Sequence, residues 1–424
     1  MEREFQDSLL PNGIHLHTYV TDRFKTVLCK LYIHQPLGPK ASATALLPFV
    51  LGRGCRTYPT LRDIARRLEE LYGAIFSADV VKIGERQLIE LGLSVPEEKV
   101  LGVSGLLGEA VQTLAEVVCH PLLEGEGFNQ EYFRQERELL LRKIDGLIND
   151  KPRYAMLRLF QEMCPKEPFG IHKYGSREEI EGLTAASLFA HYQEIRQGQC
   201  DLFVVGNVSP SQVEEAVQGA FADGWRSREF PPVSEGTPQG GVEIREEQDV
   251  NQGILAMGMR TGVTYRDEDY PALLFYNGIL GGFPHSKLFI NVRERASLAY
   301  FAFSRLEPTK GVLAASAGID VNEYERARDI IKEQIDALAA GDISDEELEA
   351  TRRGLIHRQL TISDDPAGLV DSHLLGLINN RIRPQRELID QLGQVAREDV
   401  VRVAQGVQPD VTFFLCGPRE REGN

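Results

Sequence analysis

Residues 281–305 read GGFPHSKLFINVRERASLAYFAFSR, and the pattern changes from helical to strand-like within this stretch. The two glycines at its start are typical of a turn, since glycine adopts backbone dihedrals that other residues avoid. Apolar residues recur at helical spacing up to Val292, and at strand spacing with several aromatics from Leu298 onwards. We therefore expect Arg293 near the end of a short helix and Tyr300 on the strand that follows.

Arg293 and Tyr300 carry side chains that can act on the same kind of group. Both can donate hydrogen bonds to a carbonyl oxygen, and a guanidinium stays charged at any working pH. Their spacing along the chain lets the two side chains converge on one cleft. The alternative is that Arg293 pairs with a surface carboxylate and Tyr300 lies in the core, because most arginines and tyrosines have structural roles.

The composition indicates a globular protein of two to four domains. The chain has 424 residues, 42% of them hydrophobic and 26% charged, with a net charge of −16. This acidic balance argues against sequence-independent nucleic-acid binding, which needs a basic face. The polar N-terminus has no signal-peptide pattern, and no apolar run is long enough to span a bilayer. Six scattered cysteines without a CxxC motif predict buried, reduced thiols and a cytoplasmic location.

Hydrophobic periodicity predicts the same order of elements twice along the chain: strand, helix, hairpin, long helices and a final strand. The predicted strands cover residues 13–18, 26–34, 74–81, 85–95, 201–206, 253–259, 300–306, 311–318 and 411–416. The predicted helices cover residues 42–51, 60–71, 98–118, 129–148, 153–163, 176–196, 270–280, 322–338, 344–360, 367–377 and 397–403.

Residues 225–241, WRSREFPPVSEGTPQGG, separate the two halves and have the composition of an extended linker. We expect an N-terminal domain over residues 1–224 and a C-terminal domain over residues 242–424. The predicted fold class is α+β, with two homologous α/β-sandwich domains, each a mixed sheet with helices on one face. A hinge about the linker is plausible.

Two segments of the chain resemble the insulinase/pitrilysin superfamily of zinc metallopeptidases. They are SKLFINVRERASLAY in the second half and LLPFVLGRGCRTYPTLRDIARRLEELYGAIFSADV in the first. The resemblance covers nearly the full chain, and the chain also resembles the non-catalytic, YmfF-like members found in bacterial two-gene sets. It implies that two such domains form half of a clamshell.

The resemblance also shows which part of the family's catalytic centre is missing. Active members carry HxxEH, in which two histidines bind zinc and the glutamate activates a water molecule. These positions fall on Ala45, Pro48 and Phe49, none of which can bind a metal or transfer a proton. The third ligand position falls near Glu136, which lies in a charged helix and is expected on its solvated face. The degenerate motif predicts no metal and no catalytic residue in this chain.

No other catalytic motif replaces the missing one. Nine histidines are present, but HxxEH, HExxH and GxSxG are absent from the sequence. His15 and His17 alternate along a predicted strand, so both rings point to one face and form a weak candidate metal pair. A structural role for both histidines is the alternative. None of the cysteines has a local partner that would activate it.

By resemblance, Arg293 and Tyr300 bind the substrate backbone across the cleft from zinc. The chain is then a non-catalytic subunit that pairs with a homologous, zinc-bearing chain and acts on peptides. One alternative is an inert protein that binds peptide or serves as a scaffold. Another is a homodimer with an unrecognised metal site around His15 and His17.

Overall fold

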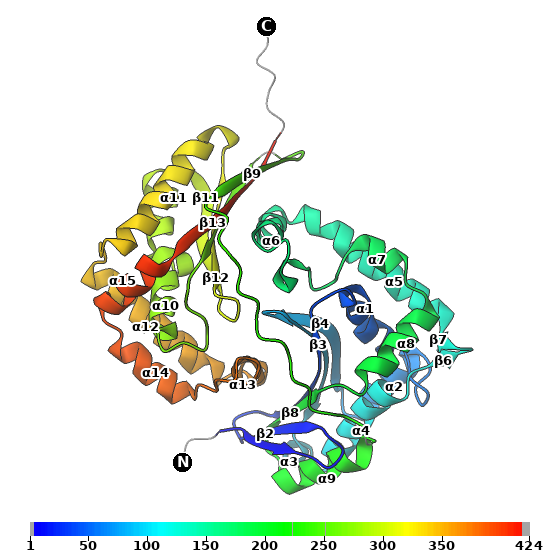
Figure 1. Cartoon of the computed structure of the whole chain (residues 1–424). Coiled ribbons are helices and arrows are strands. Elements are labelled where there is room, and N and C mark those ends of the chain that lie inside the picture. Colours follow the sequence, from blue (N-terminus) through cyan, green and yellow to red (C-terminus); the bar gives the residue numbers. More distant parts are fainter. Residues whose placement is uncertain (1–3, 223, 251, 418–424) are drawn as a thin grey trace. The chain divides into compact units, whose positions relative to one another are not determined.

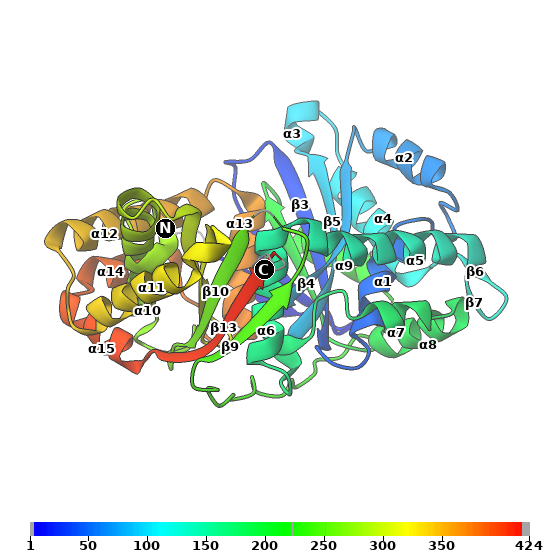
Figure 2. The ribbon, with the colours of Figure 1, turned by 90° about the horizontal axis from the view of Figure 1, so that it is seen from above.

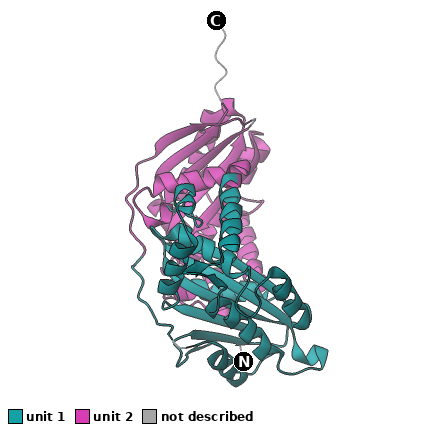
Figure 3. Ribbon diagram, turned by 90° about the vertical axis from the view of Figure 1, so that its right-hand side faces the viewer, with its two compact units in different colours: residues 1–145, 171–232, 362–375 teal, residues 146–170, 233–361, 376–424 magenta. Residues whose placement is uncertain are grey.

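The chain forms two compact units, and each unit contains segments from both halves of the sequence (Figure 3). The structure is a computed structural model that describes residues 4–222, 224–250 and 252–417. Unit 1 comprises residues 1–145, 171–232 and 362–375, and unit 2 comprises residues 146–170, 233–361 and 376–424. The sequence divides the chain at the linker, and the compact units differ from that division by the exchanged segments 146–170 and 362–375.

Unit 1 contains a six-stranded mixed sheet in the order β1-β2-β8-β3-β5-β4. Its strands are β1 (Gln6–Leu9), β2 (His15–Val20), β3 (Thr26–Pro36), β4 (Ile75–Ile83), β5 (Arg86–Pro96) and β8 (Cys200–Gly206), beside a small ribbon of β6 (Leu123–Glu124) and β7 (Gly127–Phe128). Its helices are α1 (Ala41–Leu51), α2 (Leu61–Glu70), α3 (Glu98–Leu101), α4 (Leu106–Cys119), α5 (Gln130–Asp145), α7 (Arg177–Glu181), α8 (Ala185–Ile195) and α9 (Pro210–Ala220).

Unit 2 contains a five-stranded mixed sheet in the order β11-β12-β10-β13-β9. Its strands are β9 (Val242–Glu247), β10 (Gly253–Arg260), β11 (Ala299–Glu307), β12 (Val312–Ile319) and β13 (Gln408–Cys416). Its helices are α6 (Lys151–Met163), α10 (Tyr270–Asn277), α11 (Tyr324–Ala339), α12 (Asp345–Ile362), α14 (Gln385–Gln394) and α15 (Arg397–Gly406), with π-helical turns η3 (Gly278–Gly282) and η4 (Phe289–Arg295). Helix α13 (Pro366–Ile378) begins in unit 1 and ends in unit 2.

Apart from the additional edge strand β1 in unit 1, the two sheets have the same topology, which supports the internal duplication expected from the sequence. In unit 1, β2 runs parallel to β8, and β8, β3, β5 and β4 then follow one another antiparallel. In unit 2, β9 runs parallel to β13, and β13, β10, β12 and β11 follow in the same way. Both predicted closing strands, β8 and β13, therefore take equivalent interior places (Figure 1).

Each sheet also carries, on its second face, a helical segment from the other half of the sequence. In unit 1, alternate residues of β3 face a core with α1 and α4, whereas Lys30 and Tyr32 point to the opposite face. There, the carboxylate of Asp371 on α13 lies 3.4 Å from both Lys30 Nζ and the Tyr32 hydroxyl. The predicted mixed sheets with helices are confirmed, and the exchanged segments add a helix to the second face.

In unit 2, helix α6 lies on the second face of the sheet (Figure 2). The helix contacts this face with an apolar stripe. This stripe packs against side chains of β10, β12 and β13, and its buried members are Ala155, Met156, Leu159 and Met163. Phe413 on β13 faces this cluster, and its neighbour Phe414 points to the other face, 4.5 Å from Tyr324 of α11 between ring centroids. Each large apolar side chain buried here stabilises the unit by about 1.5–3 kcal/mol.

A buried ion network fastens the segment after α6 to the same sheet. Arg260 on β10 donates to Asp410 of β13 at 2.8 Å and to Glu167 at 2.7 Å. Lys310 Nζ lies 2.5 Å from the other oxygen of Glu167, and the backbone N–H of Gln239 donates to Asp410. Because every charge in the network has an opposite partner, burial does not leave an isolated ion. The network joins the exchanged segment, the end of the linker and the sheet.

Two of the predicted long helices are wrong in length. The helix predicted over residues 98–118 is divided into α3 and α4, because Gly102 and Gly105 adopt φ of +70° and +85° between them. The helix predicted over residues 176–196 is divided into α7 and α8. Ser176 caps α7, and Thr184 begins α8 with a capping box of its own. The periodicity also missed the helices α9 and α14 and the strands β1, β6, β7 and β9.

The linker has no helix or strand among its described residues, as its composition predicts. Its side chains are nevertheless held in place: Trp225 is buried, and Phe230 in unit 1 lies under the Arg86 guanidinium, 4.2 Å from ring centroid to carbon. Across the described residues, no helix is both long and apolar enough to cross a membrane.

Leu159→Ala should destabilise the protein by about 2–5 kcal/mol, because it opens a cavity between α6 and the sheet of unit 2. Urea unfolding followed by circular dichroism measures this loss. Leu139→Ala on α5 is the control: its side chain is exposed, so the change should be near 0.5 kcal/mol. Equal losses in the two variants would contradict the role given to α6.

Candidate functional site

The degenerate zinc-motif positions lie on helix α1 of unit 1. Ala45 and Pro48 are buried with the rest of the helix, and Phe49 is the one partly exposed residue of α1. The Lys143 ammonium of α5 lies 4.1 Å from the centroid of the Phe49 ring. An aromatic ring face attracts such a cation. The place expected for a second zinc-binding imidazole therefore holds a phenyl ring under a lysine.

Glu136, the leftover third-ligand position, does not lie on a solvated face, so that expectation is wrong. The residue is only 8% exposed, on the side of α5 that packs against α1. Its carboxylate pairs with the Arg53 guanidinium, which follows the end of α1. The pairing explains the burial, since a carboxylate is rarely buried without a partner. The hydrogen-bonding capacity of Glu136 is thus directed to an arginine.

One imidazole, His191 of α8, does lie against α1. Its Nε2 is 2.8 Å from the Thr44 hydroxyl, and burial lowers its pKa. The ring is therefore neutral near pH 7 and serves as a hydrogen-bonding core residue. Sequence reasoning missed this contact, because Thr44 and His191 are 147 residues apart.

In unit 2, the helix-to-strand change expected at Arg293 and Tyr300 is confirmed. Arg293 lies near the end of η4, and Tyr300 is the second residue of β11. The pairing of β11 with β12 shifts register between Ala299 and Phe301, so Tyr300 is the extra residue of a bulge. Bulges change the direction of a side chain relative to the sheet. Ser297, between the two elements, adopts a left-handed φ of +53°.

Both side chains are available to a ligand. Tyr300 is 69% exposed, so the alternative that it belongs to the core is wrong. The Arg293 side chain is 42% exposed, stacks 4.6 Å from the Phe289 ring centroid and lies 4.0 Å from the Glu294 carboxylate. That ion pair is too long and exposed to bind the guanidinium strongly. That the two side chains converge on one cleft stays a prediction.

Gly281 explains how the turn before η4 packs against β11. A Cβ atom built at this position would lie 2.3 Å from the backbone nitrogen of Ser304, so only glycine fits there. The glycine pair at the start of the stretch therefore sets the approach of the π-helical segment to the strand that bears Tyr300.

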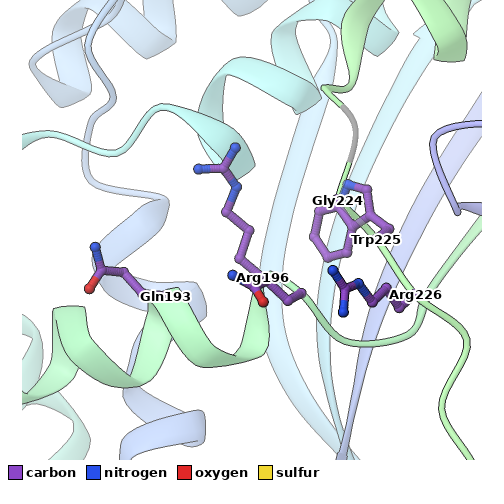
Figure 4. Close-up of a pocket in the computed structure, with 6 residues that line it drawn as sticks. Gln193, Arg196, Gly224, Trp225 and Arg226 are labelled. Atoms are coloured by element: carbon purple, nitrogen blue, oxygen red, sulfur yellow. The ribbon is translucent and has the colours of Figure 1, made fainter.

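Two hollows lie on the units, and neither is lined by Arg293 or Tyr300. In unit 2, a hollow of about 590 Å³ beside η4 is lined by residues that include Lys287, Arg295 and Glu347, but by neither Arg293 nor Tyr300. In unit 1, a hollow of about 390 Å³ lies beside Trp225, with Arg196 and Arg226 in its lining (Figure 4). The lining of this second hollow includes no nucleophile, carboxylate or imidazole.

The cysteines are not nucleophiles in this structure. All six are free and buried, as the sequence predicts. Burial raises the pKa of Cys29 to about 12 and that of Cys119 to about 11. Their thiols therefore stay protonated at neutral pH, and the reactive form is the thiolate.

Comparison with known proteins assigns the family. A sequence profile described as "Peptidase M16 inactive domain" matches residues 182–355. The chain is also 39% identical over 411 residues to the Bacillus subtilis protein named "Probable inactive metalloprotease YmfF", with 96% of each chain covered. This chain belongs to the peptidase M16 family. The resemblance to the insulinase/pitrilysin superfamily and its YmfF-like branch is confirmed.

Solved structures of other proteins share the fold. A conserved protein from Enterococcus faecalis superposes with a TM-score of 0.91 at 28% identity, covering 99% of this chain and 100% of that chain. The periplasmic protease PqqL from Escherichia coli superposes with a TM-score of 0.73 at 16% identity, covering 99% of this chain but 46% of its own length. At 16% identity, the similarity to PqqL concerns the fold alone. The present chain matches about half of the length of PqqL.

Arg53→Met should destabilise the protein by about 1–3 kcal/mol, because it leaves the Glu136 carboxylate buried without its partner. The double variant Arg53→Met/Glu136→Gln should recover part of this loss in urea unfolding. Arg134→Met is the matched control, since Arg134 forms an exposed pair with Glu138 and its removal should cost under about 1 kcal/mol. A double variant no more stable than Arg53→Met would contradict the pairing.

Proposed function

We propose that this chain is the non-catalytic subunit of a two-chain zinc peptidase. Its Arg293 and Tyr300 bind the backbone of a peptide substrate, and a homologous partner holds zinc and cleaves the peptide. The two chains together form a closed clamshell. The chain itself contributes no catalytic metal, and its free, buried cysteines support a cytoplasmic location.

The observation that carries the proposal is the contrast between the two units. In unit 1, the motif positions Ala45, Pro48 and Phe49 are filled by groups that cannot bind zinc. In unit 2, Arg293 and Tyr300 remain solvent-exposed and keep the spacing of the family signature. A chain that lacks the metal but presents the donors suits a partner that supplies the metal.

The comparisons support a second chain of similar size. The superposition with the periplasmic protease PqqL includes 99% of the present chain but only 46% of that protease. The protease is therefore more than twice as long as the present chain. A complex of the present chain with one homologous subunit would be about as large as that protease. The relative named "Probable inactive metalloprotease" supports the non-catalytic role.

Chemically, the two donors would act on the carbonyl oxygen of the peptide. The guanidinium of Arg293 and the hydroxyl of Tyr300 each donate hydrogen bonds, and negative charge grows on the carbonyl oxygen as water attacks. Donors directed at such an oxygen stabilise the transition state more than the ground state. Attack by water and proton transfer are left to groups of the partner.

Arg293→Ala and Tyr300→Phe should each lower peptide cleavage by a mixture of this chain and a homologue that carries HxxEH by at least about tenfold. A loss of that size corresponds to about 1.4 kcal/mol of transition-state stabilisation. The measurement is turnover of a quenched-fluorescence peptide library at saturating subunit concentration. Both side chains are exposed, so folding and pairing should stay intact, which size-exclusion chromatography checks.

The matched controls are other exposed residues of the same two types, an arginine and a tyrosine. Arg295→Ala removes another exposed arginine of η4, and Tyr72→Phe removes the hydroxyl of another exposed tyrosine. Both controls should retain full activity. Unchanged turnover with both Arg293→Ala and Tyr300→Phe would contradict the role assigned to these two residues. It would favour a scaffold or peptide-binding role without catalysis.

A further inference from the structure

The second face of the sheet of unit 1 carries a cluster of two imidazoles and a carboxylate from three distant segments. Asp7 lies on β1, His17 on β2 and His373 on the exchanged segment of α13. One ligand atom from each residue lies within 4.8 Å of the other two. We propose that Asp7, His17 and His373 bind a divalent transition-metal ion of the zinc class, which fastens β1 and α13 to the sheet.

The distances suit such an ion. His17 Nδ1 lies 2.8 Å from Asp7 Oδ1, and His373 Nε2 lies 3.1 Å and 3.2 Å from the two oxygens of Asp7. Tetrahedral zinc with bonds near 2.0–2.1 Å separates its ligand atoms by about 3.3 Å. The Asp7–imidazole distances are shorter than this, and the two imidazole nitrogens lie within 4.8 Å of each other, so the carboxylate has to move away from the rings and the rings have to adjust for the ion to bind. Asp7 is partly exposed, which leaves a route of entry and room for a water molecule as the fourth ligand.

A second carboxylate orients His17, the more buried of the two imidazoles in the cluster. Asp201 of β8, which is 2% exposed, places Oδ1 3.1 Å from His17 Nε2. A metal-bound histidine characteristically donates its other ring N–H to a carboxylate in this way. A neutral imidazole has one N–H and cannot donate to Asp7 and Asp201 together. A protonated ring donates to both carboxylates when no ion is bound, whereas with a metal ion on Nδ1 the neutral ring still donates from Nε2 to Asp201.

Asp201 is itself held by further groups. Its Oδ2 accepts a hydrogen bond from Gln199 at 3.0 Å and lies 2.5 Å from His34 Nε2. The carboxylate is thus fixed on the sheet before any ion binds. Such support around the ligands gives a metal site its geometry.

Aromatic rings hold both imidazoles in position. The His17 ring stacks on Phe203 with centroids 4.5 Å apart and planes inclined by 24°. The His373 ring stacks on Phe5 at 4.3 Å and 28°. These contacts restrict ring rotation, so less conformational entropy is lost when the ion binds.

The site differs from the metal sites considered from the sequence. His17 points away from the core that contains Leu16 and helix α1, so the cluster lies on the other face of the sheet from the degenerate zinc motif. His15 does not join it, because His15 Nε2 lies 2.6 Å from the Ser227 hydroxyl. The proposal also departs from the expectation that this chain holds no metal, and it assigns the ion a structural role.

The test uses the full, untagged chain, stripped with chelator and then titrated with Zn²⁺ or Co²⁺. Wild type should bind one equivalent, with the visible absorption of four-coordinate Co²⁺, and its melting temperature should rise with added zinc. His373→Ala and Asp7→Asn should each weaken binding by at least about tenfold and abolish the zinc-dependent rise. His15→Ala, two residues from His17 on the same strand, is the matched control and should bind like wild type.

The Asp7→Asn variant separates a metal site from a hydrogen-bonded cluster, because asparagine still accepts hydrogen bonds from both imidazoles but is a poorer metal ligand. Wild type that binds no zinc would overturn the proposal and leave hydrogen bonding alone. Equal zinc affinity in wild type and Asp7→Asn, or loss of binding in His15→Ala, would overturn it as well.

Discussion

The packing of helix α6 on the sheet of unit 2 is the constraint on which that unit depends. The apolar stripe from Ala155 to Met163 covers a sheet face that would otherwise be exposed, and burial of such a face is the main driving force for folding. Directly after the helix, Glu167 enters the ion network with Arg260 and Lys310. Since α6 belongs to the first half of the sequence, unit 2 cannot complete its core from the second half alone.

The same arrangement in unit 1 is polar rather than apolar. Residues 362–375 lie over Lys30, Tyr32 and the imidazole–carboxylate cluster, and the contacts include Asp371 and His373. The two sheets are equivalent in topology, but the segment on the second face makes polar contacts in unit 1 and apolar contacts in unit 2. An apolar stripe supplies a large burial energy, whereas a polar face depends on complete hydrogen bonding or on an ion.

Local signals along the chain were enough to predict most elements and the duplicated plan. Helix α2 begins directly after Thr60, where the sequence pattern begins the predicted helix, and the change of period around Arg293 and Tyr300 marks η4 and β11. What could not be predicted depends on distant residues. Periodicity shows that α6 has an apolar face but not which sheet it covers, and Asp7 meets His373 across 366 residues. The expectation for Glu136 failed for the same reason, because its partner Arg53 lies 83 residues away.

The central claim is that the exposed Arg293 and Tyr300 complete a site whose metal lies in another chain. Its most direct test titrates this chain into a fixed amount of a homologue that carries HxxEH and measures peptide cleavage. The account predicts no cleavage by this chain alone, and turnover that rises with added chain, saturates at one chain per homologue and is lost with chelator. Equal turnover by the homologue with and without this chain would contradict it.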